Sequence, residues 1–273
     1  PAAAAAAGLR LPEAWRPGWG ELDGRILRVF LPAVANLLLM PLVGAVDLFW
    51  VGQTGDALAI AGMGAANQVY TTIYFLSSFL PALVTPKIAM AASQGNSLEG
   101  SRFVREALAF AGAIGLIGCT ALVVFPTRVL AAISSDPAVL ATAVPYLRWR
   151  GLSLVPTMWS TIGFATFRGL LDTRTPLKVT LLANALNVLL DPILMFGVGL
   201  GAAGAAAATS ASEVLGVLLF LLLLRRRGYL DGPPSFPSQK RLRSLMGNGL
   251  AVQARSLGVQ IMFIAAVRRV TSM

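Results

Sequence analysis

The chain has 273 residues, of which 56% are hydrophobic and only 12% are charged. A soluble domain carries about 25% charged residues, so this composition excludes an ordinary soluble fold and predicts an all-α integral membrane protein. The formal net charge of +10 does not indicate nucleic-acid binding, because Lys and Arg lie between apolar segments, where they face cytoplasm and anionic membrane lipid.

Six apolar segments reach the length of about 20 residues that a membrane-spanning helix needs. A Gly-rich stretch, 197–204, divides one long apolar block into the last two of them. In chain order the predicted spans are 29–51, 58–86, 107–125, 145–167, 177–197 and 203–224. The sequence therefore predicts a lobe of six transmembrane helices over 29–224, and residues 245–273 as the truncated start of a seventh.

The remaining segments are polar or irregular in composition. Residues 1–28 form an N-terminal segment that could be disordered, and residues 225–244 form a Pro-rich linker. The chain begins with Pro and stops inside an apolar segment, so we expect it to be truncated at both ends. Basic residues precede the first span and follow the second, fourth and sixth, which places the amino terminus and the linker in the cytoplasm. Whether the membrane is a plastid or a plasma membrane is left open.

Three carboxylates lie inside predicted spans: Asp47, Asp191 and Glu213. A charge at the bilayer centre costs at least about 2.5–3.5 kcal/mol, so such residues are usually retained for a function. In the structural alternative, Asp47 and Glu213 pair with a buried Arg, and Asp191 marks a helix interruption at Pro192. The chain has no His and a single Cys, so proton binding falls to these carboxyls and no metal site is expected.

Neutral polar residues recur at helical spacing near these carboxylates. Lipid offers no hydrogen-bond partners, so we expect the polar stripes to line a shared hydrated cavity within the lobe. The expected cavity-lining residues are Asn36 on the first span, Asn67, Thr71, Tyr74 and Ser78 on the second, Thr180 and Asn184 on the fifth, and Glu213 on the sixth. Neutral stripes can serve only as interhelical contacts, but two of the three helices that carry them, the first and the fifth, also carry a carboxylate, which favours a functional site.

Four runs of residues resemble the multidrug-and-toxin-extrusion (MATE) transporters, and most nearly their DinF-like branch. They lie on the first span, between the fourth and fifth spans, on the fifth span and at the start of the sixth: 31–52, 167–178, 184–192 and 201–206. The resemblance implies a monomeric transporter of twelve helices in two lobes, of which this chain is the amino-terminal lobe. Small organic substrates, including cations, would bind between the lobes.

The same resemblance implies an ion site in this lobe. It places Asp47, Asn187 and Asp191 in the site, and by position also Tyr146 and Thr209. It also implies a bending proline, Pro32, on the first helix. The coupling ion would be a proton or sodium, and no cofactor is expected.

The leading hypothesis is a cation-coupled efflux antiporter. A lipid-linked flippase is the alternative within transport; its cavity should be lined with Arg and Lys, whereas these spans carry mainly acids, although Arg255 keeps it open. A truncated half without transport activity is a further alternative. An enzyme is not expected, because Val46-Asp47 and Leu190-Asp191 do not match the motifs of intramembrane aspartyl proteases, and Asp-rich prenyltransferase motifs are missing from the sequence.

Overall fold

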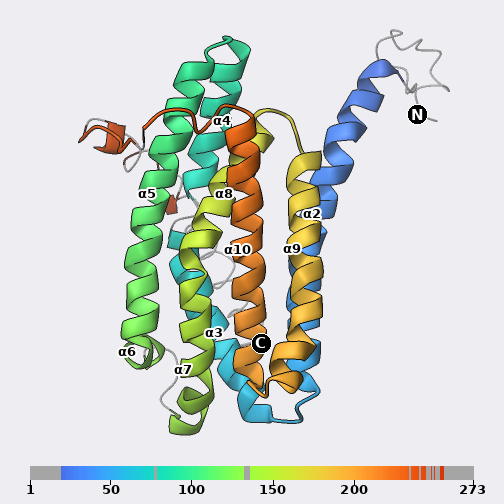
Figure 1. Cartoon of the computed structure of the whole chain (residues 1–273), viewed down its shortest axis with the longest axis vertical. Helices are drawn as coiled ribbons and strands as arrows, with labels where there is room; N and C mark the ends of the chain where they lie inside the picture. Colours follow the sequence, from blue (N-terminus) through green and yellow to red (C-terminus); the bar gives the residue numbers. More distant parts are fainter. Residues whose placement is uncertain are drawn as a thin grey trace, which may run out of the picture.

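The computed structural model describes residues 20–76, 79–131, 136–233, 235–239, 241–243, 247, 249, 253 and 254. These residues fold into helices that run side by side in one bundle (Figure 1). In chain order they are α2 (Glu21–Gly52), α3 (Ala57–Leu76), α4 (Phe79–Ser93), α5 (Ser97–Val124), α6 (Pro126–Leu130), α7 (Pro137–Leu152), α8 (Leu154–Gly169), α9 (Arg174–Pro192), the π-helical segment η2 (Ile193–Gly197) and α10 (Ala202–Arg226). The fold is all-α, as predicted.

Several predicted spans have different limits in the structure. α2 begins at Glu21, so part of the predicted N-terminal segment is helical, whereas residues 1–19 lie outside the described part. α5 begins at Ser97 and α7 at Pro137, both earlier than predicted. The first turns of α5 carry charged side chains, so apolar length alone does not reveal them. The first turn of α7 is apolar, and its predicted start at 145 was simply too late. The predicted seventh helix lies almost wholly outside the described residues.

The second and fourth predicted spans are each broken into two helices. α3 and α4 meet at an angle of 41°, and α7 and α8 meet at Ser153. Pro81 lies in the first turn of α4 and Pro156 in the first turn of α8. Proline lacks the backbone donor that would continue the preceding helix, so each break falls where the sequence places a proline.

Within the described residues, four helices are long and apolar enough to cross a membrane: α2, α5, α9 with η2, and α10. The bent pair of α3 and α4 makes a fifth if it counts as one span. α7 and α8 have 16 residues each, fewer than a span needs, but they run end to end through the bundle (Figure 1). We infer that they cross the membrane together.

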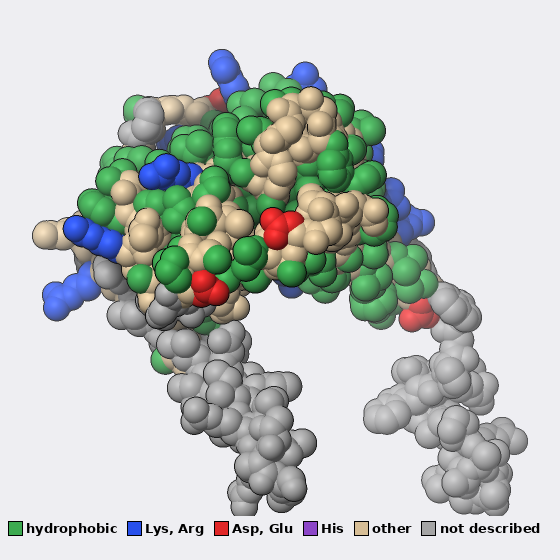
Figure 2. All heavy atoms as spheres, turned by 90° about the horizontal axis from the view of Figure 1, so that it is seen from below, with side chains coloured by type: hydrophobic (Ala, Val, Ile, Leu, Met, Phe, Trp, Pro, Cys, Tyr) green, Lys and Arg blue, Asp and Glu red, His purple; other side chains and the backbone are tan. Residues whose placement is uncertain are grey.

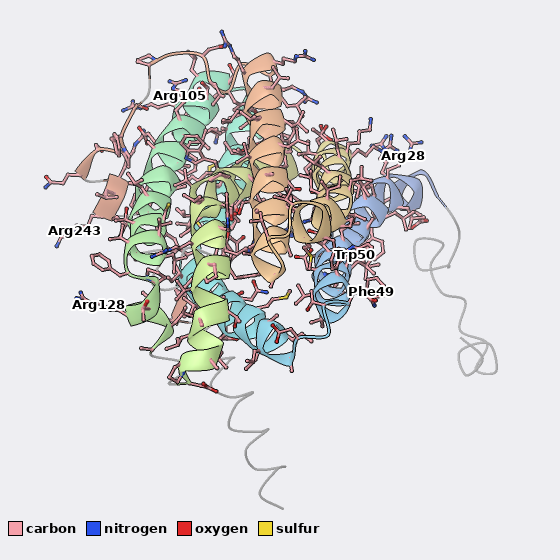
Figure 3. All side chains as sticks on the ribbon, turned by 60° about the horizontal axis from the view of Figure 1, so that its bottom comes forward. Arg28, Phe49, Trp50, Arg105, Arg128 and Arg243 are labelled. Carbon is pink, nitrogen blue, oxygen red and sulfur yellow. The ribbon has the colours of Figure 1, made fainter. Side chains whose placement is uncertain are left out.

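The two ends of the bundle differ in charge. Figure 3 shows Arg28 and Arg105 at one end and Arg128 at the other. The turn between α8 and α9 and the Arg-rich end of α10 lie at the same end as Arg28 (Figure 1). The opposite end carries mainly hydrophobic and uncharged side chains (Figure 2). This distribution is the one that the positive-inside rule gives for a cytoplasmic amino terminus.

The linker after α10 is fastened to α5 by a buried carboxylate. Glu106 is fully buried, and its two oxygens lie 3.0 Å from Arg102 and 3.0 Å from Arg241. Arg105 also donates to the backbone carbonyl of Asp231. Because an unpaired buried carboxylate would cost several kcal/mol, these contacts hold the linker against the Arg-rich end of the bundle.

Asp172 organises the turn between α8 and α9. It accepts hydrogen bonds from the backbone and hydroxyl of Thr175, at 3.0 and 2.8 Å, and from Arg227 at 3.0 Å. Partial burial opposes ionisation, but the Thr175 bonds and the Arg227 charge outweigh it and hold the pKa of Asp172 below its usual range. The carboxylate thus joins the start of α9 to the end of α10.

We expect Asp172→Ala to destabilise the protein by about 1 kcal/mol, the typical cost of losing a helix-capping side chain. Since the folded-state pKa is lowered, this contribution is complete above the pKa of an unfolded Asp, about 3.9, and is lost as pH falls through the folded value. Thermal unfolding in detergent at neutral and acidic pH measures it. A difference between wild type and variant that persists undiminished below pH ~3 would contradict this account.

Candidate functional site

Asp47 and Asp191 come together in the interior of the lobe, although they lie on α2 and α9. Asp47 is 7% exposed and Asp191 is fully buried, and the two carboxyls lie close enough to interact electrostatically. Asn187 donates to Asp191 Oδ1 at 3.2 Å and to Thr209 Oγ1 at 3.4 Å, and Thr209 lies 3.4 Å from Asp47 Oδ2. Three helices thus contribute to a single polar site.

The site is rich in oxygen atoms that lack donors. Asp47 Oδ1, Asp191 Oδ2 and Asn187 Oδ1 are all buried and accept no hydrogen bond from any described residue. A buried acceptor without a partner is costly, and two carboxylates at this distance repel each other when both are ionised. A proton or another small cation relieves both costs, so the arrangement is suited to binding one.

Close packing of α9, η2 and α10 sets the geometry of the site. At Gly204, a Cβ atom would lie 2.7–2.8 Å from backbone atoms of Leu194 and Met195, so only glycine allows this approach. Asp191 is the second-last residue of α9, and the π-helical segment η2 begins two residues later at Ile193. π-Helical turns occur frequently at functional sites, and here the turn lies next to the buried carboxyl.

Tyr146 lies beside this site without a direct hydrogen bond to either carboxyl. Its side chain is 1% exposed, and its hydroxyl donates to Asn67 Oδ1 at 3.3 Å. Its electrostatic neighbours include Asp47 and Asp191. The structure therefore places Tyr146 against the site and adds Asn67, predicted only as a cavity-lining residue, as its partner.

Asn36 and Pro32 lie together on α2, which continues as one helix through Pro32 and Pro41. Asn36 is 5% exposed; its amide donates to the Pro32 carbonyl at 3.1 Å, and its Oδ1 is buried without a partner among the described residues. The predicted hinge at Pro32 stays a prediction.

The other predicted cavity residues have different surroundings. Tyr74 is half-buried and lies 3.2 Å from the Thr161 hydroxyl, whereas Thr71 is exposed on the lobe surface. Thr180 and Asn184 are half-buried, and their side chains make no hydrogen bond to a described residue. Ser78 lies outside the described residues. Only part of each polar stripe therefore joins the interior network.

Sequence reasoning missed Arg150 as an interior residue. The predicted fourth span begins at 145, which puts Arg150 near its entrance, but the Arg150 side chain is 13% exposed and lies 3.9 Å from Glu213. Glu213 thus lies next to a buried Arg, the contact that the structural alternative expected, whereas no ion pair to Asp47 is formed among the described residues. The spacing of Tyr146 and Arg150, one helical turn apart, is the signal that could have revealed it.

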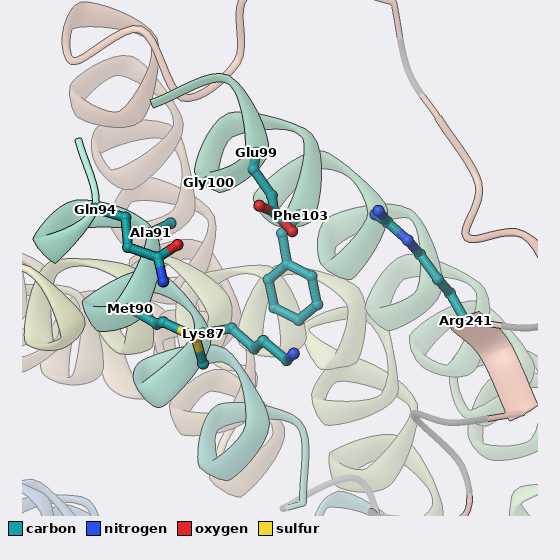
Figure 4. Close-up of a pocket in the computed structure, with 8 residues that line it drawn as sticks. All are labelled: Lys87, Met90, Ala91, Gln94, Glu99, Gly100, Phe103 and Arg241. Carbon is teal, nitrogen blue, oxygen red and sulfur yellow. The ribbon is translucent and has the colours of Figure 1, made fainter. Parts of the chain in front are cut away.

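A separate pocket of about 170 Å³ lies between the last turns of α4 and the first turns of α5 (Figure 4). It is lined by Lys87, Met90, Ala91, Gln94, Glu99, Gly100, Phe103 and Arg241. It contains none of the residues of the Asp47 and Asp191 site. In the described part of the chain, no three His, Cys, Asp or Glu side chains gather as a metal site would require.

A bundle of apolar helices around a buried polar interior is the architecture of a multi-pass integral membrane protein. The chain belongs to the MATE family of transporters, since the family model MatE matches residues 32–193. Members of this family are transporters rather than enzymes. The narrower assignment to the DinF-like branch stays a prediction.

Relatives and solved structures agree with this assignment. Protein DETOXIFICATION 44, chloroplastic, of Arabidopsis thaliana is 33% identical over 231 residues, which cover 80% of this chain and 44% of the relative. A probable multidrug resistance protein NorM of Thermotoga maritima is 30% identical over 247 residues, 81% of this chain and 50% of the relative. A crystal structure of MATE in the bent conformation shares the fold with a TM-score of 0.78 at 22% identity, covering 89% of this chain and 55% of that one. The chain thus spans about half the length of the relatives it matches.

Proposed function

We propose that this lobe binds the coupling cation, a proton or sodium, of a secondary active transporter that exports small organic compounds. The observation that carries the proposal is the convergence of Asp47, Asn187, Asp191 and Thr209 from three helices, with three buried oxygens unpartnered. Sodium prefers hard oxygen ligands, as other alkali and alkaline-earth cations do, and a shared proton satisfies a close carboxyl pair.

The position of Asp47 supports a link between ion binding and movement. α2 lies at the edge of the bundle against α9 (Figure 1), and its apolar side chains are largely exposed. A helix with so few buried contacts is the easiest to displace. Asp47 is the α2 residue that contributes to the ion site. Ion binding there therefore changes the interactions that hold α2 against the other helices.

Export of small organic compounds is supported by the family and by the name of the Thermotoga relative, which refers to multidrug resistance. The alternating exposure of a site between two lobes is the expected mechanism of such transporters. The flippase alternative has less support, because the interior Arg150 already has Glu213 as a partner and Arg255 lies outside the described residues.

The test is gradient-driven transport by the complete gene product in lipid vesicles, with proton or sodium gradients imposed and with cationic dyes and organic acids as substrates. We expect Asp47→Asn to reduce transport to background, because the amide keeps the shape of the side chain but carries no negative charge and does not bind a proton near neutral pH. Asp56→Asn is the control: Asp56 is exposed and caps α3 at 2.9 Å from Leu58 N, and Asn keeps such a cap. Full transport after substitution of both Asp47 and Asp191 would contradict the proposal.

A further inference from the structure

A second group of charged side chains lies inside the lobe, where α7, α8 and α10 meet. Arg150 is in the last turn of α7, and Glu213 is in the middle of α10. Arg150 Nη1 and Glu213 Oε1 are 3.9 Å apart, and the side chains are 13% and 25% exposed. The guanidinium carbon of Arg150 also lies 4.0 Å from the ring centroid of Tyr70. These residues are separate from the hydrogen-bonded site of Asp47 and Asp191.

The ion pair between Arg150 and Glu213 is loose. A separation of 3.9 Å is too long for a hydrogen bond, and Arg150 Nε and Nη1 are buried without a hydrogen bond to any described residue. A buried Arg that serves only structure is normally fixed by several of its five donors. Glu213 therefore offsets the charge of Arg150 without fixing the position of the guanidinium group. The positive charge of Arg150 also interacts with Asp47.

The hydroxyl of Thr157 can form a hydrogen bond with the Glu213 carboxyl whether that carboxyl is ionised or protonated. Glu213 Oε2 lies 2.5 Å from the Thr157 hydroxyl, which is also 2.8 Å from the Ser153 carbonyl and 2.8 Å from the Tyr70 hydroxyl. A threonine hydroxyl has one proton to donate. Thr157 donates it to Glu213 when the carboxyl is ionised. When Glu213 is protonated, Glu213 donates to Thr157, and Thr157 donates to the Ser153 carbonyl.

The group of Arg150 and Glu213 lies one helical turn along α7 and α10 from residues at the site of Asp47 and Asp191. Thr209 and Glu213 are four residues apart on α10, and Tyr146 and Arg150 are four apart on α7, so each pair lies on one helix face about 5–6 Å apart.

The charged and titratable side chains that face Glu213 can be named for each helix packed against α10. They are Arg150 from α7 and Tyr70 and Tyr74 from α3. α8 contributes the hydroxyl of Thr157. α2 and α9 bring Asp47 and Asp191 to Thr209 and Asn187. Arg150 is thus a cation that interacts both with Glu213 and with Asp47 of the acidic site.

We propose that Glu213 is a second proton-binding carboxyl of this lobe and that Arg150 transmits its charge state to Asp47 and Asp191. The inference rests on the proposed cation site at Asp47 and Asp191. While Glu213 is ionised, its pair with Arg150 is neutral, and the neighbouring site holds its cation. When Glu213 binds a proton, the charge of Arg150 is no longer offset and repels that cation. A proton taken up at Glu213 is then exchanged for the cation released at Asp47.

The experiment is an infrared titration of the complete gene product in lipid vesicles, in which the carboxyl bands of buried acids are followed against pH. Difference spectra of Asp47→Asn and Glu213→Gln assign the two bands. We expect the Glu213 band to titrate, and Glu213→Gln to move the pH midpoint of the Asp47 band downward. Arg150→Gln should move that midpoint upward, with each shift equal to a change of about fivefold or more in proton affinity. The double variant Arg150→Gln with Glu213→Gln, which lacks both charges, should have an Asp47 midpoint close to the wild-type value.

A purely structural ion pair gives a different pattern, because either single substitution breaks it in the same way. The proposal is overturned if Glu213→Gln removes no titrating band, or if both single variants move the Asp47 midpoint in the same direction. Thr157→Val tests it with both charges in place: loss of the hydroxyl should disfavour ionised Glu213 and move its band upward in pH, and an unmoved band also overturns the proposal. Failure of the coupling site itself would appear instead as unchanged transport in Asp47→Asn, which these spectra do not measure.

Discussion

Asp191→Asn is expected to abolish ion-driven transport while the protein still folds and inserts into the membrane. Asp191 is fully buried, and its Oδ1 accepts a hydrogen bond from Asn187 at 3.2 Å. The amide oxygen of the variant can accept the same bond, so the packing of α9 against α10 is retained. The negative charge is lost, which leaves Asp47 as the one carboxyl of the site.

The expected size of the effect follows from charge alone. Removing one of two carboxyls from a buried site should lower cation affinity at least about tenfold, which corresponds to only about 1.4 kcal/mol. Transport and sodium- or proton-binding should be measured on the same purified sample. Asp56→Asn makes the same exchange on an exposed residue and should leave both unchanged. If Asp191→Asn transported normally at all ion concentrations, the assignment of Asp191 would be wrong.

The carboxylates of the site could be predicted from the sequence because charge is so costly in an apolar span. Asp47 and Asp191 stand out in this way, and Asn187 follows at one-turn spacing from Asp191. Thr209 came only from the family resemblance, because helical periodicity shows which residues share a face but not which helix that face contacts. The contact between Thr209 and Asp47 joins residues 162 positions apart.

Arg150 was misplaced because the limits of the fourth span were wrong. α7 begins at Pro137 rather than at 145, so Arg150 lies well inside the bundle, three residues before the break at Ser153. The break itself was not predicted, since Pro156 lies in the interior of an apolar pattern that continues on both sides of it. Hydropathy shows how long an apolar segment is, but it does not show where the helix breaks. Here Arg150 lies next to such a break and points into the bundle.

The buried ion pairs at the Arg-rich end of the bundle likewise could not be predicted from local sequence. Glu106 directly precedes the predicted span 107–125, and it is fully buried between Arg102 and Arg241. Its second partner is 135 residues away. Such a long-range pair depends on how the linker returns to α5, which local sequence patterns do not encode.

Gly204→Ala is expected to destabilise the lobe and to disrupt the ion site at the same time. The added methyl group would lie 2.7 Å from the Leu194 carbonyl carbon and 2.8 Å from Met195 N. These are backbone atoms, which cannot rotate away as a side chain does, so α10 must move from η2. Overpacking of this kind costs about 1–3 kcal/mol, and here the displaced helix carries Thr209.

Gly216→Ala is the matched control on the same helix. A Cβ atom there would meet Ala183 Cβ at 3.7 Å, an ordinary contact, and Ala favours a helix over Gly by about 1 kcal/mol. Thermal unfolding in detergent should therefore show a lower midpoint for Gly204→Ala and an equal or higher midpoint for Gly216→Ala. Cation binding should weaken only in Gly204→Ala, because only that substitution separates Asp191 from Thr209. If Gly204→Ala were destabilised but bound the cation with unchanged affinity, the close approach of α10 and η2 would matter for folding and not for the site.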